Sequence, residues 1–183
     1  MKRHLSNAIY FFIGLLGFKA SAAMAASDIF LCDPGGVIQG EATDDRHKGC
    51  IDVLAWSWGV SLPVDPTGVG GTGAPNIQDL SFTKFIDKSS PILMQGSTAG
   101  TTFPKVELHS YGTCCETEYL KITMEEVFVT SFQTGGTGGE DRPTENVSLN
   151  FAKIEYCYTF IDALGKPGVT DCYGWDAQQN EPY

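Results

Sequence analysis

Apolar and polar residues alternate with a period of two along most of the chain after residue 50. This alternation places apolar stripes at Leu80 and Phe82, at Val106 and Leu108, at Leu120, Ile122 and Met124, at Val147, Leu149 and Phe151, and at Ile154, Tyr156, Tyr158 and Phe160. Residues 51–60 carry apolar side chains at both odd and even positions, which predicts a strand buried on both sides. Strands rich in aromatic and β-branched residues, separated by Gly and Pro, predict an all-β barrel or sandwich.

The alternation changes phase at Glu125-Glu126 and again at Ala152-Lys153, which predicts a bulge or bend at each point. One segment has the pattern of a helix instead. Asp87 and the serines after it can cap a helix, Pro91 suits its first turn, and Gly100 is placed to end it. The chain is therefore expected to hold one short helix within a β protein.

The first 25 residues have the composition of a secretory signal peptide. A basic start, Met1 to His4, precedes an apolar run over residues 8–18 that is too short to span a bilayer. A stretch of small residues follows and predicts cleavage after Ala25, which divides the chain into residues 1–25 and a mature domain at residues 26–183. We therefore expect a secreted or periplasmic protein that has no membrane association once the peptide is removed.

Net charge limits the partners of the mature domain. The whole chain has a formal charge of −10, and the signal peptide holds three basic residues and no acidic one, so cleavage brings the charge to about −13. A strongly acidic domain repels phosphate backbones, which argues against a nucleic-acid partner.

Six cysteines remain after cleavage, and in an exported protein they are expected to form disulfides. These disulfide candidates are Cys32, Cys50, Cys114, Cys115, Cys157 and Cys172. Cys157 and Cys172 flank a turn-like segment symmetrically, so they are expected to face each other across a hairpin. A bond between the adjacent Cys114 and Cys115 would be strained, and each is expected to pair elsewhere. The remaining connectivity stays open.

Neither a metal site nor a cofactor site is predicted. The sequence has no C-x-x-C, and two histidines, His47 and His109, remain after cleavage. The glycine-rich stretches near residues 68–73 and 135–139 lack the strand, helix and lysine of a phosphate-binding loop.

The segment Asp44 to Lys48 is the most polar cluster of the chain and admits two interpretations. His47 could be a general base held by a carboxylate. The interpretation we favour is a turn in which Asp side chains bond the backbone before a strand. No G-x-S-x-G elbow supports a serine nucleophile. No catalytic residue is predicted, and the protein is not expected to be an enzyme.

Several sequence blocks in a fixed order resemble the Hcp family of type VI secretion tube proteins. The blocks are GEATDDRHK at 40–48, IDVLAWSWGV at 51–60, QDLSFTK at 78–84, DKSSP at 87–91, PTENVSLNFAKIE at 143–155 and GWD at 174–176. The resemblance covers essentially the whole mature domain. It implies an antiparallel β-barrel with one flanking helix, six copies closing into a ring, and rings stacking into a tube.

The resemblance also implies a function. The leading hypothesis is an exported, ring-forming structural protein related to type VI secretion, which associates with itself and with secretion-machine or effector proteins. The alternative is a monomeric, secreted, disulfide-stabilised β-barrel that works as a binding module. The signal peptide and the six cysteines are departures from the family pattern.

Overall fold

The computed structural model describes residues 28–63, 73–112, 117–139 and 142–183. The signal peptide predicted at residues 1–25 and the cysteines Cys114 and Cys115 lie outside these ranges. No helix among the described residues is long and apolar enough to cross a membrane.

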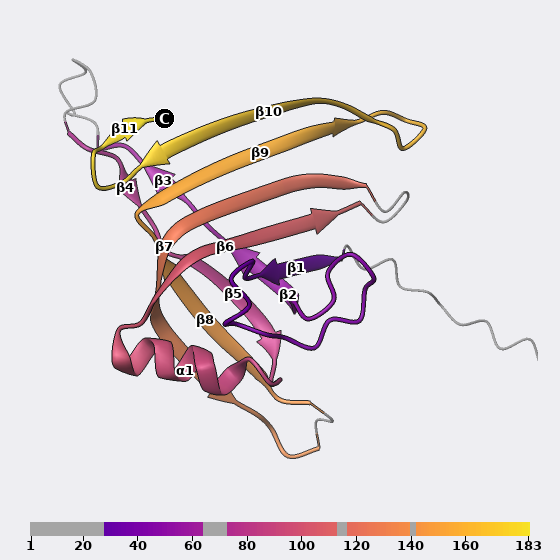
Figure 1. Cartoon of the computed structure of the whole chain (residues 1–183), viewed down its shortest axis with the longest axis vertical. Helices are drawn as coiled ribbons and strands as arrows, with labels where there is room; N and C mark the ends of the chain where they lie inside the picture. Colours follow the sequence, from indigo (N-terminus) through magenta and orange to yellow (C-terminus); the bar gives the residue numbers. More distant parts are fainter. Residues whose placement is uncertain (1–27, 64–72, 113–116, 140–141) are drawn as a thin grey trace, which may run out of the picture.

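Six antiparallel strands close into a barrel (Figure 1). They are β1 (Ile29–Cys32), β2 (Ile51–Ser57), β5 (Leu80–Phe85), β6 (Thr102–Tyr111), β7 (Glu118–Gly135) and β8 (Thr144–Asn150). The order around the barrel is β6-β1-β2-β5-β8-β7, and the pairing of β7 with β6 closes it. The all-β barrel predicted from the sequence is confirmed.

Strand β7 belongs to two parts of the molecule because it bends. Glu126 interrupts it with a φ of 53°. The residues before Glu126 pair with β6 and β9 (Lys153–Ile161), and those from Phe128 onward pair with β8, while Val127 and Phe128 still pair with β6. The phase change predicted at Glu125-Glu126 is therefore a bend within one long strand. The phase change predicted at Ala152-Lys153 is the connection between β8 and β9.

Strands β9 and β10 (Pro167–Asp176) extend the β7 side of the sheet beyond the barrel (Figure 1). We call residues 153–176 the arm. The short strand β11 (Glu181–Pro182) adds to β10 only at Trp175 and Asp176, and a separate two-stranded ribbon consists of β3 (Val60–Ser61) and β4 (Asn76–Ile77).

The single helix in the described chain, α1 (Ser90–Ala99), packs against β7 and contributes Leu93 to the core. Pro91 lies in its first turn, and Gly100 ends it in the left-handed conformation with a φ of 63°, as predicted. Ser89 occupies the N-cap position without a side-chain bond to the helix; its own N–H and hydroxyl instead donate to Asp87.

The inward side chains of the barrel form one apolar core. Leu80, Phe82, Leu108, Ile122 and Leu149 are among its fully buried members, and all lie on the predicted apolar stripes. The expectation that residues 51–60 are buried on both sides is wrong. Ile51 and Val53 face the core, whereas Leu54 and Val60 are about half exposed. A register shift between Val53 and Ala55 changes the phase of β2, so that Trp56 packs against the core after it.

Candidate functional site

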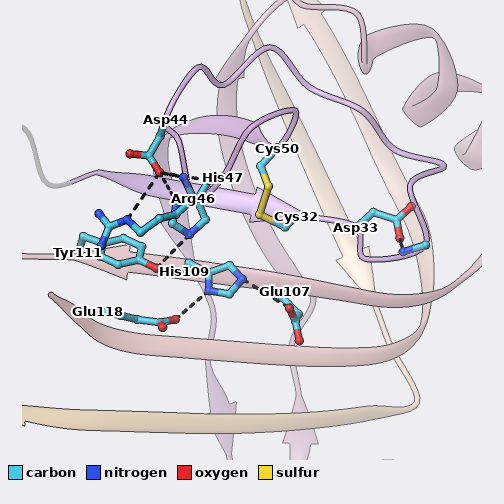
Figure 2. Close-up of a disulfide and its surroundings, with 11 residues drawn as sticks. Cys32, Asp33, Asp44, Arg46, His47, Cys50, Glu107, His109, Tyr111 and Glu118 are labelled. Carbon is cyan, nitrogen blue, oxygen red and sulfur yellow. Dashed lines mark hydrogen bonds and ion pairs between the residues drawn. A yellow bond between two sulfur atoms is a disulfide. The ribbon is translucent and has the colours of Figure 1, made fainter. Parts of the chain in front are cut away.

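The excursion between β1 and β2, residues 33–50, folds back over the outer surface of β1 and β6. A disulfide between Cys32 and Cys50 closes the excursion at its base, with Cα atoms 4.6 Å apart (Figure 2). Gly40 is required inside it, because a Cβ atom at that position would lie 2.2 Å from the Cys50 carbonyl oxygen. The excursion is thus a closely packed, covalently closed cover.

His47 belongs to this excursion, and its ring contacts Asp44, Tyr111 and Phe30. Its Nδ1 is 2.7 Å from Asp44 Oδ1, and its Nε2 is 2.9 Å from the Tyr111 hydroxyl oxygen (Figure 2). The ring stacks parallel on Phe30 with centroids 4.3 Å apart, and only 6% of the residue is exposed. His47 therefore joins the excursion to β1 and β6.

Asp44 and Tyr111 engage the two ring nitrogens of His47. The hydrogen bond from His47 holds the pKa of the Asp44 carboxyl below its usual value. Burial, with a further contribution from Glu118, raises the pKa of Tyr111 to about 12. The Asp44 carboxylate can only accept, so His47 Nδ1–H donates to it, and Nε2 forms the hydrogen bond with the Tyr111 hydroxyl. The result is a chain of hydrogen bonds from Asp44 through His47 to Tyr111.

His109 lies beside this chain, with its ring centroid 5.3 Å from that of His47. Its Nδ1 is 2.8 Å from Glu118 Oε1, and its Nε2 is 3.5 Å from Glu107 Oε2. The Arg46 guanidinium stacks over the Tyr111 ring at 4.7 Å. His109 is thus a hydrogen-bonded histidine on the side of β6 opposite the buried Val106 and Leu108.

Asp44, His47 and Tyr111 are residue types found in acid–base sites, but their geometry is structural: they fasten the excursion to β6. We call these three residues the clip. Both nitrogens of the His47 ring are engaged and the ring is buried, so neither nitrogen faces a space where a substrate proton could lie. The turn interpretation of residues 44–48 is confirmed, since Asp44 Oδ1 accepts from the backbone N–H of Arg46 and of His47. The burial of His47 was not predicted, because its partner Tyr111 is 64 residues away.

The hairpin disulfide predicted between Cys157 and Cys172 is confirmed, and the two residues are direct register partners in β9 and β10. In the described part of the chain, one group of three possible metal ligands is present, and it consists of Glu155 with these two cysteines. Their sulfurs are bonded to each other, so they offer no thiolate to a metal ion.

A groove of about 620 Å³ opens at the base of the arm, away from the histidines. Its walls are mainly aromatic and aliphatic, with Trp58, Tyr156, Tyr173 and Trp175 among them. Trp58 also packs against the core, as does Trp56. The described residues that line the groove include no converging acid and base groups of the kind a hydrolase needs, and this lining suits apolar contact.

Comparison with known proteins identifies relatives of this chain. Residues 30–158 match the family model described as type VI secretion system effector, Hcp. The chain is 49% identical to protein hcp1 of Pseudomonas aeruginosa over 150 residues, which cover 79% of this chain and 93% of that protein. It is 27% identical to the major exported protein of the same organism over 93 residues, 49% of this chain and 54% of that one.

The fold comparison extends over most of the chain. A solved type six secretion system protein superposes with a TM-score of 0.80 at 30% identity, covering 86% of this chain and all of that one. The family consists of structural type VI secretion proteins and is not an enzyme family. On the family match, the identity to hcp1 and the shared barrel, the chain belongs to the Hcp family of type VI secretion proteins.

Proposed function

We propose that this chain is an exported structural protein whose copies close into rings of six, and that these rings stack into a tube related to type VI secretion. The observation that carries the proposal is the alignment with protein hcp1, which spans 93% of that protein at 49% identity. The family match over residues 30–158 spans the strands of the barrel, which supports assembly of the same kind in this chain.

Export is supported by two independent features. Residues 1–25 have the pattern of a cleavable signal peptide, and the structure contains two disulfides, Cys32–Cys50 and Cys157–Cys172. Disulfides persist in oxidising compartments outside the cytoplasm. A secreted or periplasmic location therefore fits both features, and secretion-machine or effector proteins are the expected partners there.

The alternative, a monomeric secreted binding module, is favoured by the same disulfides, because they stabilise an isolated barrel by about 2–4 kcal/mol each. One feature argues against it. The aromatic face of the arm includes Tyr158 and Phe160, which are 47% and 56% exposed. A protein that works alone rarely leaves such an apolar face uncovered.

Light scattering and negative-stain imaging of the purified protein, kept free of reductant, test the proposal. Rings of six subunits support it. A monomer at every concentration contradicts it and moves the function to the binding module. N-terminal sequencing of the exported product tests the first step separately: a start at Ala26 is expected, and retention of residues 1–25 would overturn cleavage.

A further inference from the structure

Three side chains that can bind a metal ion lie together on one side of the arm. Cys157 of β9 and Cys172 of β10 are direct register partners, and Glu155 lies two residues before Cys157 on the same side of the sheet. One carboxylate oxygen of Glu155 and the two sulfur atoms all lie within 4.8 Å of one another. The disulfide occupies both sulfurs in the oxidised protein, so this trio becomes available when the bond is reduced.

Glu155 has no partner of its own. Its side chain is only half exposed, yet it makes no hydrogen bond or ion pair with the described residues. On the β10 side its register partner is Gly174, and the Tyr183 ring lies 3.0 Å from where a Cβ atom of Gly174 would be. The Tyr183 ring therefore bounds the space beside Glu155, and the open side of that carboxylate is the side of the cysteines.

The spacing of the three ligand atoms suits zinc. Zn²⁺ binds thiolate sulfur at about 2.3 Å and carboxylate oxygen at about 2.0–2.2 Å, so the ligand atoms of a tetrahedral site lie about 3.6–3.8 Å apart. After reduction, rotation of the two cysteine side chains can separate the sulfurs to that spacing. Glu155 then has to approach by no more than about 1 Å. Three protein ligands leave the fourth position to water.

The surrounding charges favour a cation bound by three anionic ligands. Two thiolates and one carboxylate carry a charge of about −3, which Zn²⁺ reduces to about −1. Lys121 is the register partner of Cys157 on β7, and Lys153 lies two residues before Glu155. Lys121 pairs with Glu107 at 3.0 Å and Lys153 with Asp176 at 3.4 Å, so both stand beside the trio while bound to other carboxylates.

We propose that the reduced chain binds one Zn²⁺ through Cys157, Cys172 and Glu155, and that formation of the disulfide expels it. The metal then joins β9 and β10 at the position where the disulfide joins them later, so the register of the arm is held in both redox states. The site itself requires neither export nor assembly. Only the timing of the exchange, after the chain leaves a reducing compartment, rests on the proposed export.

The exchange balances in protons and electrons. When Zn²⁺ binds, the thiols of Cys157 and Cys172 each lose a proton to solvent. In an oxidising compartment, an external protein disulfide accepts two electrons from the two thiolates and takes up two protons to become a dithiol. The sulfur–sulfur bond forms, both metal–sulfur bonds break, and Zn²⁺ leaves with Glu155 as its one remaining protein ligand.

Cobalt is the spectroscopic probe for the site. The full chain is reduced without oxygen, freed of reductant and titrated with Co²⁺, and thiolate charge-transfer and tetrahedral cobalt bands are expected that Zn²⁺ removes. The double change Cys157→Ser and Cys172→Ser is expected to abolish the bands. The matched control, Cys32→Ser with Cys50→Ser, removes the other disulfide and is expected to keep them. Absence of the bands in the wild type, or their survival in the first double variant, overturns the site.

A single substitution tests the carboxylate without touching the cysteines. Glu155→Gln keeps the shape of the side chain and is expected to weaken Zn²⁺ binding to the reduced protein by about tenfold or more. Asp171→Asn removes a carboxylate next to Cys172 in sequence but on the opposite side of the strand, and is expected to bind as the wild type does. Equal affinities of wild type and Glu155→Gln, or equal losses in the two variants, overturn the role of Glu155.

Oxidation of the zinc-loaded protein tests the exchange. Oxidised glutathione is added, and release of one Zn²⁺ per chain, measured with a chromogenic indicator, is expected to accompany formation of the Cys157–Cys172 bond. Zinc that stays bound after peptide mapping shows this bond contradicts the exchange. If the exported protein instead carries these two cysteines as free thiols while the cobalt titration succeeds, the metal site stands and the proposed export into an oxidising compartment fails.

Discussion

Lys84 and Glu145 form an ion pair inside the barrel, with Lys84 Nζ 2.8 Å from Glu145 Oε2 and both side chains almost fully buried. Lys84 Nζ also donates to Asp87 at 2.8 Å and to the Ser90 hydroxyl at 2.9 Å. Ser90 in turn donates to Glu145. One lysine thus joins β5, β8 and the start of α1, and its positive charge balances two carboxylates that are shielded from water.

Lys84→Met is expected to destabilise the fold by about 3–5 kcal/mol, because it leaves buried carboxylates without a counter-charge. Denaturant unfolding at a fixed protein concentration measures the change. Lys105→Met is the control: Lys105 is 43% exposed and 3.5 Å from Glu107, so about 1 kcal/mol or less is expected. Equal losses in the two variants would contradict the role of the buried network.

Gly40→Ala is expected to cost about 1–3 kcal/mol or more, because the new methyl group would collide with the Cys50 backbone. Gly135→Ala is the matched control, since a Cβ atom there meets open space. Thermal unfolding of the two variants gives the comparison. Similar midpoints would mean that the excursion relaxes without strain.

Both disulfides are expected to stabilise the protein. Removing the Cys157–Cys172 bond by a double Cys→Ser change takes away a cross-link with a sequence separation of 15, worth about 3 kcal/mol. The Cys32–Cys50 bond, with a separation of 18, should give a similar loss. Peptide mapping without reduction checks the pairing first, and any other partner for these cysteines would contradict it.

Alkaline pH is expected to weaken the clip around His47. The pKa of Tyr111 is raised in the folded protein, to about 12 from an ordinary 10. Its contribution is therefore fully present below pH 10 and is lost as the pH rises through 12. Unfolding free energies of the wild type and Tyr111→Phe should converge over this interval. A constant difference between the two proteins would show that Tyr111 does not titrate with folding.

The barrel and its core could be predicted because period-two alternation reports which side chains face inward. Lys84 shows where this fails: it lies on the stripe of Leu80 and Phe82, yet its burial depends on Glu145, which is 61 positions later. The pattern in residues 51–60 misled because a register shift between Val53 and Ala55 changes which positions face the core, from Val53 before it to Trp56 after it.

The candidate site was predicted only in part, because local sequence does not reveal partners that are distant in the chain. The Asp44 turn and the Cys157–Cys172 pair depend on neighbours or on a simple hairpin, so local sequence identifies them. The partners of His47 come from β1 and β6, and no spacing in the sequence brings Phe30 and Tyr111 to the same ring.

The bond between Cys157 and Cys172 has a mechanical consequence. It lies on the side of the arm opposite Tyr156 and Tyr173, because directly paired residues share a face and adjacent residues alternate. A force along the arm therefore acts on a covalent bond as well as on hydrogen bonds. The disulfide prevents β9 and β10 from shifting in register or separating at that position. The disulfide therefore stiffens the arm without occupying the side that carries Tyr156 and Tyr173.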